Sequence, residues 1–423
     1  MTLRARTEPA TRGRLTKGLG AALAVVVGGV GLGLVTGVAS APTASADGVK
    51  CEAGSTHNVT ATPPALARLG AEAAWGLSTG SHVVVAVVDS GVDRGNAHLP
   101  SSAVLPGADL IAADGTDGRT DNTGHGTAVA GEIAARFVSG SGVIGLAKNA
   151  TILPVRIFYT DADGAESSLR PNTARIAAGI DYAVAQGATI INVSASSTTD
   201  DPVLAKAVHD ATAARRLVVA SAGNRLTSED TTDSPRYPAA YPGVLSVTAV
   251  DDHDNATEDS IHGAHVDVAA PGTNVLTAFH AAGDCMLGAE ASTSFATAYA
   301  SAAAALVASR YKSESPAQWA YRLEATASRQ SPGTRDDMAG WGVIRPYDAL
   351  AFVDDGTAPG PPSPMHRAPE QSPGPAQTLK FGPRVDPLAA TRAIASWWVL
   401  AGGVVLLGAL IASRLTARRR RRS

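Results

Sequence analysis

The run Val83-Val84-Val85-Ala86-Val87-Val88, followed directly by Asp89-Ser90-Gly91, decides the fold class of this chain. An uninterrupted apolar run rich in β-branched residues is typical of a strand that is covered on both faces, as in a parallel sheet. Asp89 would then lie at the carboxyl end of a buried strand, where open α/β sheets bind their ligands. The stretch therefore predicts both a fold and a functional carboxylate.

Similar apolar runs alternate with helical patterns along the chain. This alternation predicts an α/β fold, with a doubly wound, mostly parallel sheet between layers of helices. The expected strands are 83–88, 152–158, 189–193, 217–220 and 244–250, and the expected helices are 126–135, 173–186, 202–214 and 294–309.

The composition fits one large domain with appendages, because the chain has 423 residues of which 45% are apolar. Its net charge is −3 and only 4% of its residues are aromatic. A nucleic-acid-binding protein would show a basic patch or a stacking surface, so no nucleic-acid partner is expected.

The N-terminus has the pattern of a secretory signal. Basic residues precede an uncharged stretch over 18–46, which ends in Ala44-Ser45-Ala46. We expect residues 1–46 to be a signal peptide cleaved after Ala46, with Ala41 as a second cleavage site. An uncleaved membrane anchor is the alternative, since the apolar part is longer than a minimal signal core.

The C-terminus has the pattern of a membrane anchor. Residues 393–413 carry no charge, include Trp397 and Trp398, and are followed by an arginine-rich tail over 414–423. This length spans a hydrocarbon core of about 30 Å, and the positive-inside rule places the tail in the cytoplasm. The protein is thus expected in the cell membrane as a single-pass protein, with everything before the helix outside the cytoplasm.

Three further parts lie between the two ends. Residues 47–80 form an N-terminal arm with an apolar helical pattern through Leu66, Leu69, Ala73 and Leu77, and 81–353 hold the alternating pattern of the main domain. Residues 354–392 are rich in proline and are expected to be an extended tether, with a proline-rich recognition segment as the alternative.

Only two cysteines, Cys51 and Cys285, occur in the chain. They suit an oxidising extracellular compartment and are able to form one disulfide, provided that the fold brings their thiols together. Such a bond would tie the arm to the segment that leads to Ser294.

Two short segments add catalytic groups to Asp89. Gly124-His125-Gly126-Thr127 places an imidazole at the start of a predicted helix, and Ser292-Thr293-Ser294-Phe295-Ala296 places a hydroxyl at the start of another. The helix dipole favours developing negative charge at such a position. We expect Ser294 to be the nucleophile, His125 the base and Asp89 the residue that orients the ring.

An oxyanion formed in such a reaction needs hydrogen-bond donors. Ala222-Gly223-Asn224 follows the predicted strand 217–220 and offers the side-chain amide of Asn224 beside the backbone N–H of Ser294.

Together these blocks resemble the subtilisin-like (subtilase) serine proteases, over roughly residues 65–353. The order Asp, His, Ser along the chain is the subtilisin order. The resemblance implies a subtilisin-like three-layer domain, serine endopeptidase activity through an acyl-enzyme, a protein or peptide substrate, and no cofactor.

The signal peptide, tether, terminal helix and Trp341-Gly342-Val343-Ile344-Arg345-Pro346 resemble more narrowly the mycosins, membrane-anchored subtilases of actinobacterial type VII secretion systems. This implies association with a type VII secretion membrane complex. One alternative is a mainly structural or interaction subunit of such a complex with weak or dispensable protease activity. Another is a free, secreted degradative subtilase.

The resemblance also assigns substrate-binding residues. Ser194-Ala195-Ser196 would pair with the substrate backbone and form one wall of the primary specificity pocket, and the segment ending at Gly223 would form the other wall. Ser196 stands where the family usually has glycine, so we expect a small or medium side chain before the scissile bond.

Two further departures surround Ser294. The family usually has glycine at the position of Ser292, which predicts strain if that position needs a positive φ. It usually has proline at the position of Ala298, so we expect the helix to continue unbroken and the Ser294 hydroxyl to shift slightly. These changes predict slow activity.

No metal site is predicted. His262 and His265 precede a strand-and-turn pattern and are expected to be structural. The loop acids Asp114, Asp117 and Asp121, and the segment Asp161-Ala162-Asp163-Gly164, leave only a weak alternative of structural calcium.

Overall fold

The structure is a computed structural model, and it describes residues 51, 57–111, 116–159, 170–226, 228, 230–287, 291–366 and 386–420. The predicted signal peptide over 1–46 and residues 367–385 of the predicted tether lie outside the described residues.

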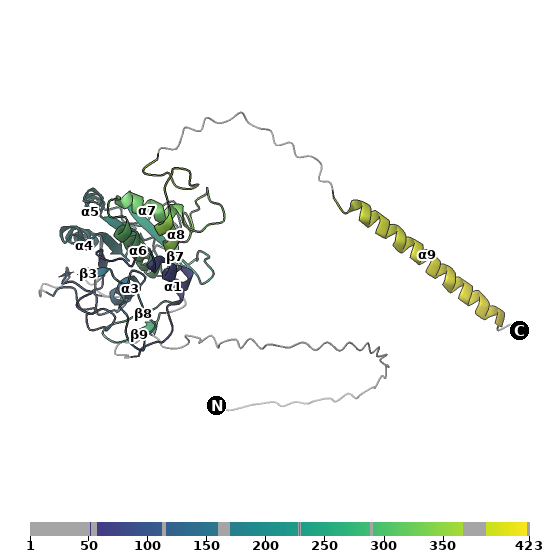
Figure 1. The fold of residues 1–423 in the computed structure, drawn as a ribbon, viewed down its shortest axis with the longest axis horizontal. Helices are drawn as coiled ribbons and strands as arrows, with labels where there is room; N and C mark the ends of the chain where they lie inside the picture. The colour runs from purple at the N-terminus through teal and green to yellow at the C-terminus, as the bar shows by residue number, and fades with distance from the viewer. Residues whose placement is uncertain are drawn as a thin grey trace, which may run out of the picture. The chain divides into compact units, whose positions relative to one another are not determined.

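A seven-stranded sheet with helices packed around it forms the centre of the domain (Figure 1). Its strand order is β2-β3-β1-β4-β5-β6-β7. Every neighbouring pair is parallel, as the continuous apolar runs predict. Strand β1 lies between β3 and β4. After β1 the chain adds β2 and β3 on one side of it, and then crosses to add β4 on the other side. The crevice at such a reversal is where open α/β sheets bind ligands. The strands are β1 (Val84–Asp89), β2 (Ala108–Asp109), β3 (Thr151–Arg156), β4 (Ile190–Val193), β5 (Leu217–Ser221), β6 (Val244–Val250) and β7 (Val268–Pro271).

Helices cover both faces of the sheet and confirm the three-layer prediction. Val85 and Val87 of β1 belong to the same core cluster as α3 (His125–Ala134) and α6 (Thr293–Arg310). Ala86 and Val88 point into the opposite core cluster, against α4 (Thr173–Ala185) and α5 (Pro202–Ala213). The smaller elements are α1 (Pro64–Arg68), α2 (Ala71–Trp75), α7 (Pro316–Ala325), α8 (Pro346–Ala351), and an antiparallel hairpin of β8 (Leu276–Ala278) and β9 (Asp284–Met286).

Helix α6 is buried on almost every side, and most of its residues are alanine, serine or threonine. Small side chains let it contact five strands, β1, β4, β5, β6 and β7, and the surrounding helices closely. The helix runs without a break through Ala298, as predicted, because alanine keeps the backbone N–H that proline lacks.

The predicted disulfide between Cys51 and Cys285 is present, with its Cα atoms 5.0 Å apart. Beside it, the backbone N–H of Val59 donates to the Asp284 carboxylate at 3.0 Å, so the arm is also hydrogen-bonded to β9. The helical pattern of the arm forms two short helices instead of one, because Gly70 between them adopts a left-handed conformation with φ +62°.

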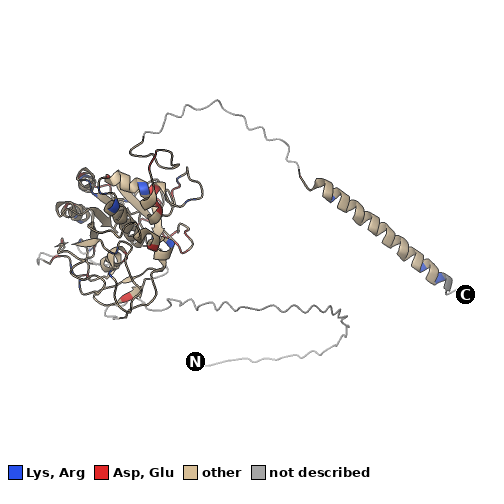
Figure 2. Cartoon of the chain, in the orientation of Figure 1, with Lys and Arg blue, Asp and Glu red and all other residues tan. Residues whose placement is uncertain are grey.

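The predicted membrane segment lies within α9 (Ala389–Arg420), which is longer than the expected 393–413. It is the one helix in the described part of the chain that is long and apolar enough to cross a membrane. At 1.5 Å per residue its 32 residues extend about 48 Å, more than a hydrocarbon core of about 30 Å. Figure 2 shows basic residues at its C-terminal end and an uncharged middle.

Candidate active site

Asp89 and His125 form a hydrogen-bonded pair. Asp89 ends β1, is 0% exposed, and its Oδ1 accepts from His125 Nδ1–H at 2.7 Å and from Ser90 N–H at 2.7 Å. Since a carboxylate only accepts, this contact places the ring proton on Nδ1 and leaves Nε2 as the basic nitrogen. His125 is the first residue of α3, as predicted to within one residue.

Ser294 lies in the first turn of α6 and is 5% exposed. Its hydroxyl donates to the Ser194 carbonyl at 3.1 Å, and the Ser194 hydroxyl donates to the Ser294 carbonyl at 3.0 Å. The His125 ring packs beside Phe295, with ring centroids 5.6 Å apart. The N-termini of α3 and α6 and the ends of β1 and β4 therefore meet at one edge of the sheet.

Asn224 is held in one orientation by Thr293. Its Oδ1 accepts from the backbone N–H of Thr293 at 2.8 Å and from the Thr293 hydroxyl at 2.9 Å. The Thr293 hydroxyl also contacts the Ser221 hydroxyl at 2.5 Å. With its oxygen fixed, the amide presents its NH₂ end as the donor. Thr293 is thus a positioning residue that the sequence analysis did not identify.

The predicted strain at Ser292 is wrong. Ser292 precedes α6 in an extended conformation, with φ −127° and ψ 123°, which any residue adopts. Its N–H donates to the Gly272 carbonyl at 3.0 Å, and this backbone hydrogen bond holds the extended residue at the entry to the helix.

The proposed substrate-binding residues lie on two sides of Ser294. Ser194-Ala195-Ser196 directly follow β4, and Ser194 exchanges hydrogen bonds with Ser294. Gly223 directly precedes Asn224, whose side chain binds Thr293.

Asp121 has a larger role than a loop acid. It is 6% exposed, and its Oδ1 accepts from the Ser90 hydroxyl at 2.9 Å and from Gly124 N–H at 2.9 Å. Its Oδ2 accepts from Thr127 N–H at 2.8 Å and from the Thr127 hydroxyl at 2.7 Å. Asp121 thereby caps the N-terminus of α3 and joins it to the residue after Asp89. The N-cap residue itself is Gly124, which has no side chain, and no local sequence signal marks Asp121, three residues earlier, as its substitute.

We expect Asp121→Asn to lower both stability and activity. In this variant an amide NH₂ replaces one carboxylate oxygen and cannot accept hydrogen bonds from the donors of Thr127 or Gly124. A hydrogen bond to a charged group contributes about 1.5–3 kcal/mol to stability. The free energy of unfolding should fall by about 2–4 kcal/mol. A shift of His125 by about 1 Å lowers kcat by up to about 10². Chemical unfolding and peptide-cleavage rates measure the two effects.

Asp117→Asn is the matched control, because Asp117 lies in the same loop with its side chain 38% exposed and paired with Arg119. The Arg119 guanidinium holds the pKa of Asp117 below its usual value, but exposed pairs contribute at most about 1 kcal/mol. Equal losses in the two variants would contradict the role assigned to Asp121.

His262 and His265 have structural partners, as expected. His262 Nε2–H donates to the Thr257 carbonyl at 3.0 Å, and His265 Nε2–H donates to the Ala222 carbonyl at 3.2 Å. Burial lowers the pKa of His265, which favours its neutral form. Among the described residues, no group of three or more acidic, histidine or cysteine side chains is arranged to hold a metal ion. Asp114 and 161–164 lie outside these residues.

Glu132 is a buried carboxyl on α3, the helix that begins with His125. It is 2% exposed, and neither of its carboxyl oxygens has a hydrogen-bond partner within the part of the chain that the structure describes. Burial raises its pKa well above the ordinary 4.5. Between pH 4.5 and this raised pKa, Glu132 therefore keeps its proton in the folded protein and releases it in the unfolded chain.

This difference predicts a pH-dependent stability. Above about pH 4.5 the unfolded chain loses the Glu132 proton first, so the free energy of unfolding falls by about 1.4 kcal/mol per pH unit until the folded carboxyl ionises. Glu132→Gln cannot titrate and should show a flatter pH profile of unfolding between pH 5 and 8. Glu72→Gln, at an exposed glutamate of α2, is the control and should keep the wild-type slope.

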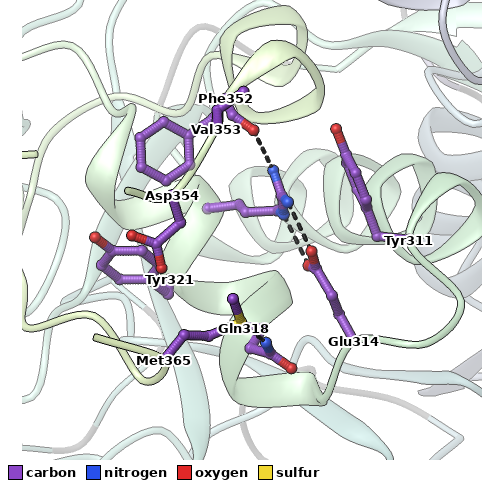
Figure 3. Close-up of a pocket in the computed structure, with 9 residues that line it drawn as sticks. Tyr311, Glu314, Gln318, Tyr321, Phe352, Val353, Asp354 and Met365 are labelled. Carbon is purple, nitrogen blue, oxygen red and sulfur yellow. Dashed lines mark hydrogen bonds and ion pairs between the residues drawn. The ribbon is translucent and has the colours of Figure 1, made fainter. Parts of the chain in front are cut away.

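A cavity of about 250 Å³ lies elsewhere, between α7 and the chain that follows α8 (Figure 3). Arg322 in its wall donates to Glu314 at 2.6 and 2.7 Å and to the Phe352 carbonyl at 2.7 Å. Tyr311 stacks on the guanidinium, 3.6 Å from ring centroid to Cζ. Arg322 is paired with Glu314, and none of the predicted catalytic residues Asp89, His125 and Ser294 lines this cavity, so it is a separate feature at the end of the domain.

Comparison with known proteins gives a consistent result. The family model described as the subtilase family matches residues 80–342. Thermitase of Thermoactinomyces vulgaris is 33% identical over 285 residues, which are 67% of this chain and 94% of thermitase.

Two solved structures extend the comparison. The serine protease MycP1, described as an essential component of the type VII (ESX-1) secretion system, is 29% identical with a TM-score of 0.62, covering 72% of this chain and 92% of MycP1. A chain of an intact ESX-5 inner membrane complex is 27% identical with a TM-score of 0.65, covering 86% of this chain and 92% of that chain.

Proposed function

Because this chain belongs to the subtilase family and is a subtilisin-type serine endopeptidase, we propose that it acts through Asp89, His125 and Ser294 as a membrane-anchored peptidase of a type VII secretion system. The observation that carries the catalytic assignment is the 2.7 Å hydrogen bond from His125 to the buried Asp89. The ring of His125 also packs beside Phe295, the residue that follows Ser294.

The geometry supports an acyl-transfer mechanism. The Ser294 hydroxyl turns from the Ser194 carbonyl toward His125, transfers its proton to Nε2, and forms a bond to the scissile carbonyl carbon. Asp89 stabilises the resulting imidazolium. The Asn224 amide and the Ser294 N–H bind the oxyanion. The C–N bond then breaks, His125 gives its proton to the leaving amine, and water hydrolyses the acyl-enzyme by the same steps.

Covalent labelling tests the catalytic assignment. Phenylmethylsulfonyl fluoride reacts with a serine that a neighbouring base activates, so treatment of the full-length protein in detergent should sulfonylate Ser294. Mass spectrometry of the digest locates the adduct. His125→Ala should label far more slowly, while equal labelling of this variant, or an adduct on another serine, would contradict the mechanism.

We divide the chain as the sequence predicts. A signal peptide over 1–46 precedes an arm over 47–80 and a catalytic domain over 81–353. A tether over 354–392, a membrane helix over 393–413 and a cytoplasmic tail over 414–423 follow. The uncharged centre and basic end of α9 support the last two assignments (Figure 2). A tether of this composition spans on the order of 100 Å, so the active site reaches substrates well away from the membrane surface.

Fractionation of cells tests the anchor. The full-length protein should sediment with membranes, and deletion of 391–423 should release the catalytic domain into the medium. External protease should digest the domain of the full-length protein in intact cells but spare an epitope on the tail. Sedimentation of the deletion variant with membranes would show that another segment, such as an uncleaved N-terminus, is the anchor.

Association with a type VII secretion complex is supported by the similarity to MycP1 and to a chain of the ESX-5 inner membrane complex. The same observation favours a second candidate function, a mainly structural subunit with dispensable proteolysis. Peptide cleavage and secretion measured with Ser294→Ala distinguish these two candidate functions.

A further inference from the structure

Arg236 is among the largest fully buried side chains of the described residues, at 1% exposed. Its guanidinium donates to the carbonyls of Asp230 at 2.6 Å, Thr232 at 3.1 Å and Ser234 at 3.1 Å. The segment 230–235 thus wraps around the charged group and fixes the direction of the side chain.

The methylene stem of Arg236 lies against Gly223. A Cβ added to Gly223 would be 2.9 Å from Cγ and 3.4 Å from Cδ of the arginine, and Gly223 has φ +107°, which side chains disfavour. Gly223 directly precedes Asn224, the residue proposed to bind the oxyanion. The stem, and not the guanidinium, therefore faces the oxyanion side of the nucleophile.

The next residue links Arg236 to the other side of Ser294. Tyr237 and Ser197 form an antiparallel bridge in which each N–H donates to the other's carbonyl at 2.8 Å. Ser197 follows Ser194-Ala195-Ser196, and Ser194 exchanges hydrogen bonds with Ser294. Arg236 therefore lies where the two segments that flank the nucleophile come together.

In a bound substrate, the side chain before the scissile bond is carried by the Cα atom that is bonded to the carbonyl carbon that Ser294 attacks. The substrate-binding role proposed for Ser194-Ala195-Ser196 and Gly223 directs it into the space between these two segments. We propose that the buried stem of Arg236 closes the floor of this subsite, so that the enzyme cleaves after small, uncharged side chains such as alanine. The guanidinium behind the stem adds repulsion against lysine and arginine at that position. This inference rests on the proposed peptidase function.

The test uses the full-length protein in detergent and a set of fluorogenic peptides that differ only in the residue before the scissile bond. For the wild type, kcat/KM with alanine should exceed that with phenylalanine and that with lysine by about tenfold or more. Arg236→Ala removes the stem, so kcat/KM with phenylalanine divided by kcat/KM with alanine (the phenylalanine-to-alanine ratio) should rise by about tenfold or more. Arg236→Met keeps an unbranched stem without charge, so it should still exclude phenylalanine but discriminate less against lysine.

Arg225→Ala is the matched control. Arg225 binds the same loop from the outside, through the Thr231 carbonyl and the Asp233 carboxylate. It should leave the phenylalanine-to-alanine ratio unchanged. If Arg225→Ala shifts the ratio as Arg236→Ala does, loosening of the loop is the cause and the inference is wrong.

Other outcomes are equally decisive. Equal wild-type cleavage after phenylalanine and alanine would overturn the proposal, as would an unchanged ratio in Arg236→Ala while the alanine peptide is still cleaved. Circular dichroism checks whether Arg236→Ala folds. If it does not, the cleavage preferences of the wild type and of Arg236→Met test the proposal. Absence of cleavage of every peptide, down to the level of Ser294→Ala, would contradict the proposed function itself.

Discussion

Ser294→Ala should lower kcat for peptide cleavage by on the order of 10⁶, the size of the loss for the same change in subtilisin. The side chain that is removed makes one hydrogen bond, to the Ser194 carbonyl, so stability should change by only about 1 kcal/mol. KM should change little, because the lost bond to the substrate forms only during the reaction. Rates measured on a fluorogenic peptide, with thermal unfolding as a folding check, test this expectation.

Ser292→Ala is the matched control for Ser294→Ala. Ser292 lies two residues away, and its side chain does not cap α6. This variant should keep nearly wild-type cleavage. If Ser294→Ala cleaves as fast as Ser292→Ala, another group is the nucleophile and the mechanism is wrong.

The same two variants separate the candidate functions in the host cell. Loss of secretion with Ser294→Ala, but not with Ser292→Ala, would show that proteolysis is required. Retained secretion without cleavage would show that the chain serves the secretion complex mainly through its contacts.

Asn224→Ala should lower kcat by about 10²–10³ while KM stays near the wild-type value. The amide is aimed by Thr293, which occupies its oxygen with two hydrogen bonds and leaves the NH₂ group to bind the oxyanion. Donors fixed in this way need no reorganisation when charge develops on the substrate. Steady-state kinetics on the same peptide measures the two constants.

Two further variants make this prediction specific. Asn224→Asp has nearly the same shape but no N–H at neutral pH, so it should be at least as slow as Asn224→Ala. Thr293→Val keeps the backbone N–H that binds Asn224 but removes the hydroxyl, which bonds to Asn224 and contacts Ser221. The lost bond to Asn224 is worth about 1 kcal/mol, so kcat should fall by about fivefold. Full activity of Asn224→Asp would show that the oxyanion is bound elsewhere.

Much of the fold could be predicted because the decisive patterns are local. The runs that form β1 and β6 are apolar throughout, since both faces of a parallel sheet are covered, and the structure places these strands within one residue of expectation. Strands β8 and β9 were not predicted, because each has three residues and depends on its partner in the hairpin.

The candidate site could be predicted in part for the same reason. Asp89, His125 and Asn224 stand next to strand ends or helix starts, so their neighbours in sequence indicate their positions. Asp121 and Thr293 were missed because their roles consist of hydrogen bonds to backbone and side-chain groups that only the folded chain brings near. The strain expected at Ser292 for a positive φ does not arise, because φ at the helix entry is −127° and the Ser292 N–H binds the carbonyl of the distant Gly272.

Local patterns were enough to predict the fold class, the residue types proposed for catalysis, and an apolar segment long enough to cross a membrane. Each depends on the burial or spacing of residues that are close together in the chain. The folded structure was needed to show that Cys51 meets Cys285, that Asp121 caps the helix carrying His125, and that the stem of Arg236 packs against Gly223. Such contacts follow from how distant segments pack against a common sheet, and no local pattern records that packing.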